Sequence, residues 1–177
     1  MSRITIPSRD EAPAASQEIL DIIGKRVGFI PALHRLMALS PNVLSGLIGL
    51  QTSLGKTLDL KTRDGIALAV SKVNDCGYCL KAHAYVASAL GKMPADEIEL
   101  NKEAKSGDPK KAAAVLFASQ VVDKRGHVTD EELDAVRAAG FTDAQVIEIV
   151  ALSVQFLFTN FMNTVADTPH DFPPKAA

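Results

Sequence analysis

The stretch Asn74–His83, which reads NDCGYCLKAH, holds both cysteines of the protein and a histidine four residues after the second one. If the chain is helical here, Cys76, Cys79 and His83 occupy positions i, i+3 and i+7, which share one face of a helix. With only two cysteines in the chain, their spacing as a Cys-x-x-Cys pair indicates a functional motif. The pattern therefore predicts two thiols and an imidazole side by side on one helix.

The residues around the cysteines favour a reactive thiolate. Asn74 and Asp75 are of the types preferred at helix N-caps, so we expect Cys76 in the first helical turn. The N-terminus of a helix carries partial positive charge and free N–H groups, which stabilise a thiolate. His83 follows Cys79 by one turn and is placed to accept its proton. A disulfide across this short spacing is expected to be of the labile, catalytic kind.

Composition narrows the class of protein. The chain has 177 residues, 47% of them hydrophobic, which suits a single domain spanning residues 1–177 with a substantial core. The formal net charge of −2, with both signs interspersed, argues against a nucleic-acid partner or a basic membrane-binding face. The N-terminal residues lack the apolar segment of a signal peptide, so we expect a cytoplasmic protein. In that reducing compartment a Cys-x-x-Cys pair is more often catalytic or metal-binding than structural.

Helical periodicity accounts for almost the whole chain, and no convincing pair of strands is found, so the predicted fold class is all-α. An extended arm is expected over about residues 1–12, and a proline-rich tail over about residues 168–177. Ser16 is expected to cap the first helix. The expected helices cover residues 17–28, 32–39, 42–54, 60–73, 76–90, 94–104, 110–124, 130–139 and 143–165.

The run from Leu60 to Gly91 resembles the carboxymuconolactone decarboxylase superfamily, in its AhpD-like alkylhydroperoxidase branch. That branch pairs an acidic residue on one helix with Cys-x-x-Cys-x-x-x-His on the next, and here Asp64 stands twelve residues before the first cysteine. Two flanking segments, Val27–Pro31 and Asn160–Thr168, are similar to a group described as peroxidase-related.

The resemblance implies an AhpD-like helical bundle that assembles as a homo-oligomer, a trimer or a hexamer. It also implies a dithiol peroxidase that works without haem, flavin or metal and takes electrons from a dithiol or thioredoxin-like reductant. By this analogy Cys79 is the peroxidatic thiolate and His83 takes its proton. Cys76 resolves the sulfenic acid to a disulfide, and Asp64 feeds a proton relay to the histidine.

The chain departs from the family pattern at two positions. Asp64 stands where glutamate is common, and its shorter side chain favours a water-bridged contact with His83. Tyr78 stands where the best-studied kind of member has a histidine beside the second cysteine. Since a phenol has a reference pKa of about 10, Tyr78 cannot serve as a base near neutral pH. We expect it instead to donate a hydrogen bond to a peroxide oxygen.

Other interpretations of these residues remain open. Cys76, Cys79 and His83 supply three zinc ligands where a structural site needs four. In a second interpretation, the two cysteines are inert core residues. In a third, Asp64 is an ordinary acidic residue that stabilises the start of a helix. For the function of the whole protein, the alternatives to a peroxidase are a non-enzymatic redox-responsive oligomer and a general disulfide oxidoreductase. The superfamily's decarboxylases do not use a dithiol, which argues against that activity.

The other three histidines have no partner motif in the sequence. His34, His127 and His170 stand apart from the cysteine motif and from one another. We therefore predict that all three are surface or interface residues.

Overall fold

A computed structural model describes residues 2–172, and within that range it contains helices and no strands. The all-α prediction is therefore confirmed. The helices are α1 (Ala14–Val27), α2 (Ala32–Met37), α3 (Pro41–Leu54), α4 (Leu60–Val73), α5 (Gly77–Ala89), α6 (Ala95–Lys102), α7 (Pro109–Asp123), α8 (Asp130–Ala138) and α9 (Asp143–Ala166).

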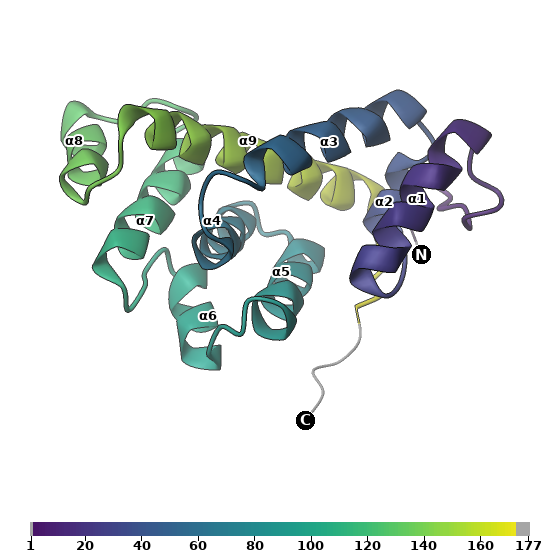
Figure 1. The fold of residues 1–177 in the computed structure, drawn as a ribbon, viewed down its shortest axis with the longest axis horizontal. Coiled ribbons are helices and arrows are strands. Elements are labelled where there is room, and N and C mark those ends of the chain that lie inside the picture. Colours follow the sequence, from purple (N-terminus) through teal and green to yellow (C-terminus); the bar gives the residue numbers. More distant parts are fainter. Residues whose placement is uncertain (1, 173–177) are drawn as a thin grey trace.

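Helix α4 lies at the centre of the bundle and contacts α5, α6, α7 and α9 (Figure 1). Its consecutive residues 66–70 are all buried, which requires neighbours on every side of the helix. Gly65 permits the closest of these approaches, because a Cβ there would lie 2.5 Å from Asn101 Oδ1 and 2.9 Å from a methyl carbon of Val115. The helix that precedes the dithiol is thus held rigidly on all sides.

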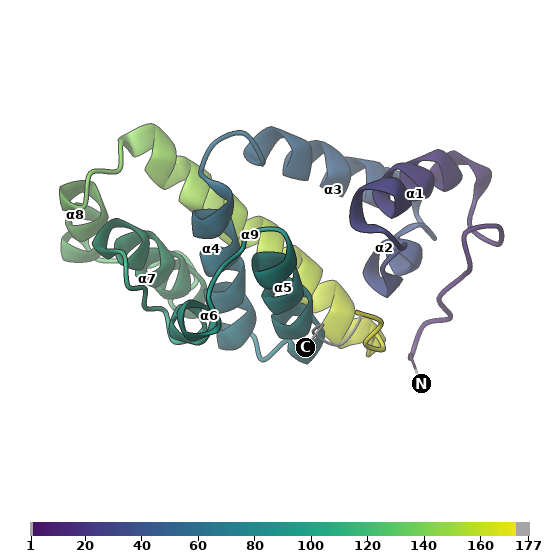
Figure 2. The same ribbon diagram turned by 60° about the horizontal axis from the view of Figure 1, so that its bottom comes forward.

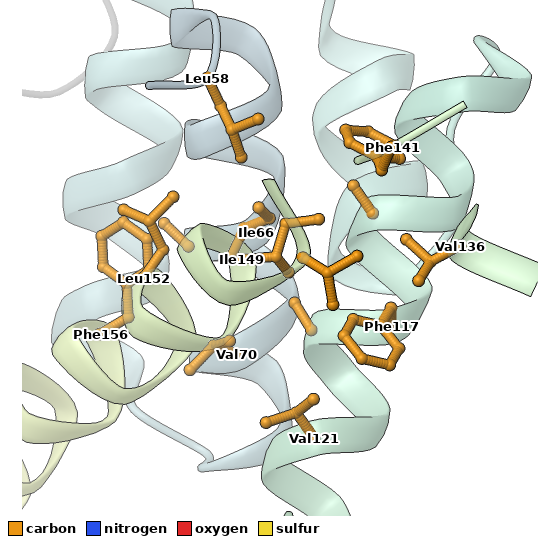
Figure 3. Close-up of a cluster of buried hydrophobic side chains, with 14 of the residues drawn as sticks. Leu58, Ile66, Val70, Phe117, Val121, Val136, Phe141, Ile149, Leu152 and Phe156 are labelled. Atoms are coloured by element: carbon orange, nitrogen blue, oxygen red, sulfur yellow. The ribbon is translucent and has the colours of Figure 1, made fainter. Parts of the chain in front are cut away.

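The largest hydrophobic cluster fills the space between α4, α7, α8 and α9 (Figure 3). Phe117, Phe141 and Phe156 contribute the aromatic rings, and Ile66 and Ile149 lie fully buried between them. This cluster fixes α9 against α4. As a result, the C-terminal half of α9 lies alongside α5, where the cysteines are.

A second cluster joins α1, α2 and α3 to the start of α5, and it includes both cysteines and Tyr78. These three N-terminal helices form the opposite end of the molecule from α7 and α8 (Figures 1 and 2). The dithiol therefore lies at the junction between the N-terminal helices and the α4–α9 bundle.

Residues 2–13 form no helix and contain a turn at residues 9–11, and Ser16 does not cap the helix that follows them. Helix α1 begins at Ala14 with Pro13 at its N-cap, and the buried Ser16 hydroxyl donates to the Ala38 carbonyl. Proline fixes its own φ near the value this position needs, and Ser16 instead ties α1 to the end of α2. Helix α8 begins with a capping box, because Thr129 and Glu132 satisfy each other's backbone N–H groups.

Among the described helices, α9 alone has the length and hydropathy of a membrane span. Half of the most apolar 18-residue segment of α9 is buried inside the fold, where the helix packs on α4 and α7. That packing accounts for much of its apolar character, as expected for a long core helix.

Candidate functional site

The turn between α4 and α5 presents the dithiol. Asn74 ends α4, and its amide donates to the Val70 carbonyl and to Asn160 Oδ1, so it caps the preceding helix instead of α5. Asp75 adopts the left-handed conformation with φ of 50°, which Asp tolerates better than most residues. Cys76 is itself the N-cap of α5. The expected N-cap role of Asn74 and Asp75 is therefore wrong by one or two positions.

Cys76 and Cys79 are joined by a disulfide, with their Cα atoms 5.3 Å apart. The Cys76 sulfur also accepts a hydrogen bond of 3.3 Å from the Cys79 N–H, as an N-cap side chain does. Both cysteines are buried, but only Cys79 lines the adjacent cavity. Cys79 thus contributes to the cavity wall, whereas Cys76 does not.

The cavity beside Cys79 has a volume of about 130 Å³ and lies between α2, α5 and α9. Its walls are mostly apolar and, among residues 2–172, include no lysine, arginine, aspartate or glutamate. The residues that line it are Val27, Pro31, Leu33, His34, Gln51, Tyr78, Cys79, Ala82, His83, Val86, Gln155, Phe156, Thr159, Asn163 and Phe172.

His83 shares this cavity with Cys79, as the sequence pattern predicts. Its ring packs edge-on against Phe156 from α9, with the ring centroids 5.1 Å apart. Burial lowers the pKa of His83 to about 4, so the imidazole is neutral at physiological pH. A neutral imidazole one helical turn from a thiol is ready to accept a proton.

Asn163 on α9 is a site residue whose role the sequence did not predict. Its side-chain Nδ2 donates to the Cys79 sulfur at 3.4 Å and to the Thr159 carbonyl at 3.1 Å. A donor aimed at the sulfur stabilises the thiolate relative to the thiol, and therefore favours a lower thiol pKa in the reduced protein.

The segment after α9 closes one side of the cavity. Asp171 accepts hydrogen bonds from the Tyr78 hydroxyl at 3.0 Å and from the Ala32 N–H at 2.5 Å, and it pairs with Arg35 at 3.7 Å. Phe172 packs on the Tyr78 ring and lines the cavity. The expected tail therefore covers the site as far as residue 172. Residues 173–177 lie outside the described part of the chain.

Tyr78 consequently has a different role from the one expected. Its hydroxyl donates to Asp171 and accepts from the Leu33 N–H at 3.4 Å, so it is not free to donate to a peroxide. Burial, and secondarily the charge of Asp171, raise the pKa of Tyr78 above its ordinary value. Tyr78 therefore anchors the C-terminal segment and α2 to the start of α5.

The structure does not bring Asp64 into the cavity wall. Its carboxyl is buried at the other end of α5, where Oδ2 lies 3.3 Å from the position of a Cβ on Gly91 and has no hydrogen-bond partner. Burial raises the pKa of Asp64 to about 7, against a smaller lowering effect of Arg63. The predicted relay between Asp64 and His83 stays a prediction.

The replacement Asp64→Asn is expected to stabilise the fold at alkaline pH. Since burial raises the folded-state pKa from 3.8 to about 7, the carboxyl costs no stability below about pH 4 and progressively more up to about pH 7. At pH 8 the amide should raise the free energy of unfolding by about 2–4 kcal/mol. Thermal unfolding at pH 8 and pH 4 measures this. An equal change at both pH values would contradict the buried-acid interpretation.

The histidine predictions are partly wrong. His127 and His170 are exposed, as expected. His34 instead lines the cavity, its Nδ1 is buried without a partner, and burial lowers its pKa to about 4. Nothing local in the sequence distinguishes it, because α2 and α5 come together only in the folded chain. Within residues 2–172, no three His, Cys, Asp or Glu side chains are grouped as a metal site.

Comparison with known proteins gives one family match, over part of the chain, and several structures of similar fold. Residues 41–120 match the carboxymuconolactone decarboxylase family. No curated protein matches the sequence. Among solved structures, a peroxidase-related protein with an alkylhydroperoxidase AhpD core from Ralstonia eutropha JMP134 superposes with a TM-score of 0.86 at 23% identity, over 96% of this chain and 92% of that one. A peroxidase-related protein from Silicibacter sp. TM1040 superposes with a TM-score of 0.83 at 20% identity, over 96% of this chain and 92% of that one.

A third similar structure is that of a debrominase. A cysteine-to-alanine variant of the debrominase Bmp8, in complex with 2,3,4-tribromopyrrole, superposes with a TM-score of 0.81 at 20% identity, over 97% of this chain and 94% of that one. At these identities the structural likeness establishes the fold, and the family match covers the helices that carry Asp64, both cysteines and His83. Residues 41–120 thus match the carboxymuconolactone decarboxylase family, and the chain as a whole has the fold of AhpD-like, peroxidase-related proteins.

Proposed function

We propose that the protein is a thiol-dependent reductase of organic hydroperoxides that uses Cys76 and Cys79 as its redox pair. The observation that carries the proposal is the presence of the Cys79 sulfur and a neutral imidazole, that of His83, in one small cavity. Proton acceptance by His83 gives the Cys79 thiolate, which Asn163 Nδ2 stabilises.

The reaction proceeds in three balanced steps. The Cys79 thiolate attacks the terminal oxygen of ROOH, the O–O bond breaks, and the departing alkoxide takes a proton from the His83 imidazolium to leave as ROH. The resulting sulfenic acid condenses with the Cys76 thiol to form the disulfide and water. An external dithiol, which is itself oxidised to a disulfide, then returns both cysteines to thiols. Such a reductant is expected in the cytoplasm.

A steady-state assay tests this function. Consumption of tert-butyl hydroperoxide is followed with dihydrolipoamide, thioredoxin and glutathione supplied separately. Turnover well beyond one equivalent per subunit is expected with a dithiol. Oxidation that stops after one equivalent with every reductant would instead indicate a redox-responsive protein. If the protein reduces other disulfides but does not reduce hydroperoxides, it is a general disulfide oxidoreductase.

A second candidate function is reductive removal of halogen from a small aromatic ring. Two observations favour it: the debrominase of similar fold, and a largely apolar cavity whose volume is close to one that holds benzene. The dithiol would supply two electrons, and the products would be the dehalogenated ring, halide and the Cys76–Cys79 disulfide. Bromide release from a bromopyrrole, measured with the same reductants, distinguishes the two functions.

We also propose that the protein is a homo-oligomer, as a trimer or hexamer. The outer face of α9 exposes a stripe at spacings of three, four and seven residues, typical of a helix–helix seam. Its members are Ile147, Val154, Phe158, Phe161 and Val165. Leu50 of α3 lies beside Val154 and Phe158 and extends the apolar surface.

Light scattering should therefore give a mass that is a multiple of the 18.8 kDa subunit at micromolar concentration. The variant Phe161→Asp places a charge in the stripe and should lower the mass. The matched change Glu148→Asp, also on α9, should leave it unchanged. A monomer mass for the parent protein would contradict the assignment of the stripe.

A further inference from the structure

Residues that line the cavity beside Cys79 carry most of the buried polar atoms that have no hydrogen-bond partner within residues 2–172. Five buried side-chain nitrogen or oxygen atoms of the described residues lack one. Three of them belong to cavity residues: His34 Nδ1, Gln155 Nε2 and Asn163 Oδ1. Because buried polar groups are nearly always paired, such a concentration in one cavity indicates a binding site for a polar ligand.

The free oxygen of Asn163 lies at the sulfur end of the cavity. Since the Thr159 carbonyl can only accept, the Asn163 atom that faces it is the amide nitrogen, and Oδ1 is the atom left unpaired. The same amide donates to the Cys79 sulfur, so this acceptor lies next to the attacking atom. It is suited to hold the O–H of a hydroperoxide.

Gln155, whose side-chain nitrogen has no partner, also lines the cavity. Gln155 precedes Asn163 by eight residues on α9, which corresponds to about 12 Å along the helix axis. An amide nitrogen can only donate, so it requires an acceptor oxygen on the ligand. His34 contributes from α2 a neutral imidazole, which binds an uncharged oxygen group.

We propose that the substrate is a short organic hydroperoxide with a second, uncharged oxygen group, its peroxide end bound by Asn163 and its far oxygen by Gln155 and His34. This inference rests on the proposed hydroperoxide reductase function. The volume of about 130 Å³ favours a short substrate over a long acyl chain. An uncharged group also fits better than a carboxylate, because the lining contains no lysine or arginine within residues 2–172.

The test compares pentyl hydroperoxide with its ω-hydroxy counterpart in the parent protein and in Gln155→Leu. Leucine is similar in size and lacks only the amide. We expect kcat/KM for the hydroxylated substrate to fall at least about tenfold, and that for pentyl hydroperoxide to change less than about threefold. Because the amide has no partner in the free protein, the melting temperature should not fall. The matched control Gln120→Leu, on α7 and outside the cavity, should change neither rate.

A binding measurement separates this inference from the proposed function. The alcohols pentanol and pentanediol are titrated by NMR into the disulfide form, which requires no chemistry. If the parent binds the diol more tightly than pentanol and Gln155→Leu loses this preference, the binding site is supported. If no hydroperoxide is reduced at the same time, the site still stands and only the proposed function is wrong. Equal turnover of both hydroperoxides, with no effect of Gln155→Leu, overturns the inference and leaves the reductase function in place.

Discussion

Replacement of Cys79 by serine is expected to reduce hydroperoxide turnover to the uncatalysed level, whereas Cys76→Ser should still permit one oxidation per subunit. Cys79 alone of the two sulfurs lines the cavity, so its loss removes the nucleophile. In Cys76→Ser the Cys79 sulfenic acid forms but has no neighbouring thiol to condense with, and excess peroxide oxidises it further to sulfinic acid. Serine is the appropriate replacement at position 76 because it preserves the N-cap hydrogen bond of α5.

The measurement is stopped-flow consumption of peroxide, followed by intact mass with and without a sulfenic-acid trap. A first oxidation at close to the parent rate in Cys76→Ser, and none in Cys79→Ser, is the expected pair of results. The reverse pair, with the label on Cys76, would show that the roles of the two cysteines are exchanged.

Replacement of His83 by alanine is expected to lower kcat/KM for hydroperoxide by about a hundred- to ten-thousand-fold, the usual contribution of a general base. The imidazole lies in the same cavity as Cys79 and is neutral because burial lowers its pKa to about 4. Because burial lowers the pKa of His83, the acid limb of the parent's pH profile should lie below the position expected for an ordinary histidine.

Iodoacetamide labelling of Cys79 across pH, in a Cys76→Ser background, measures the effect of His83 directly. His127→Ala, which removes an exposed histidine, is the control and should leave labelling unchanged. Asp64→Asn should cost only about tenfold, since that carboxyl lies outside the cavity wall. If Asp64→Asn were more damaging than His83→Ala, the proton would travel by another route.

The part of the site that the sequence predicts is the part encoded within one helix. Cys79 and His83 stand one helical turn apart, so their common face follows from geometry, and the structure places both in one cavity. Cys76 precedes the helix as its N-cap. The cap was misassigned because Asn74 suits a helix end as well as a helix start. The contact of Asn74 with Asn160, 86 residues away, determines that Asn74 ends α4 and does not start α5.

The remaining walls of the cavity come from distant segments. His34, Gln155 and Asn163 stand on α2 and α9, and no local pattern connects them with the cysteine motif. Asp171 closes the site through contacts with α2 and α5, which lie 93 or more residues earlier in the chain. Such positions are set by the packing of complete helices, and the sequence alone does not show which polar residues will face one another.

The most direct test of the central claim is a single-turnover reaction of the reduced protein with one equivalent of an organic hydroperoxide. The account predicts the loss of two hydrogen atoms in the intact mass, blocked alkylation of both Cys76 and Cys79, and release of one equivalent of the corresponding alcohol. Two thiols that remain alkylatable while the hydroperoxide persists, or a mass gain of oxygen without disulfide formation, would contradict it.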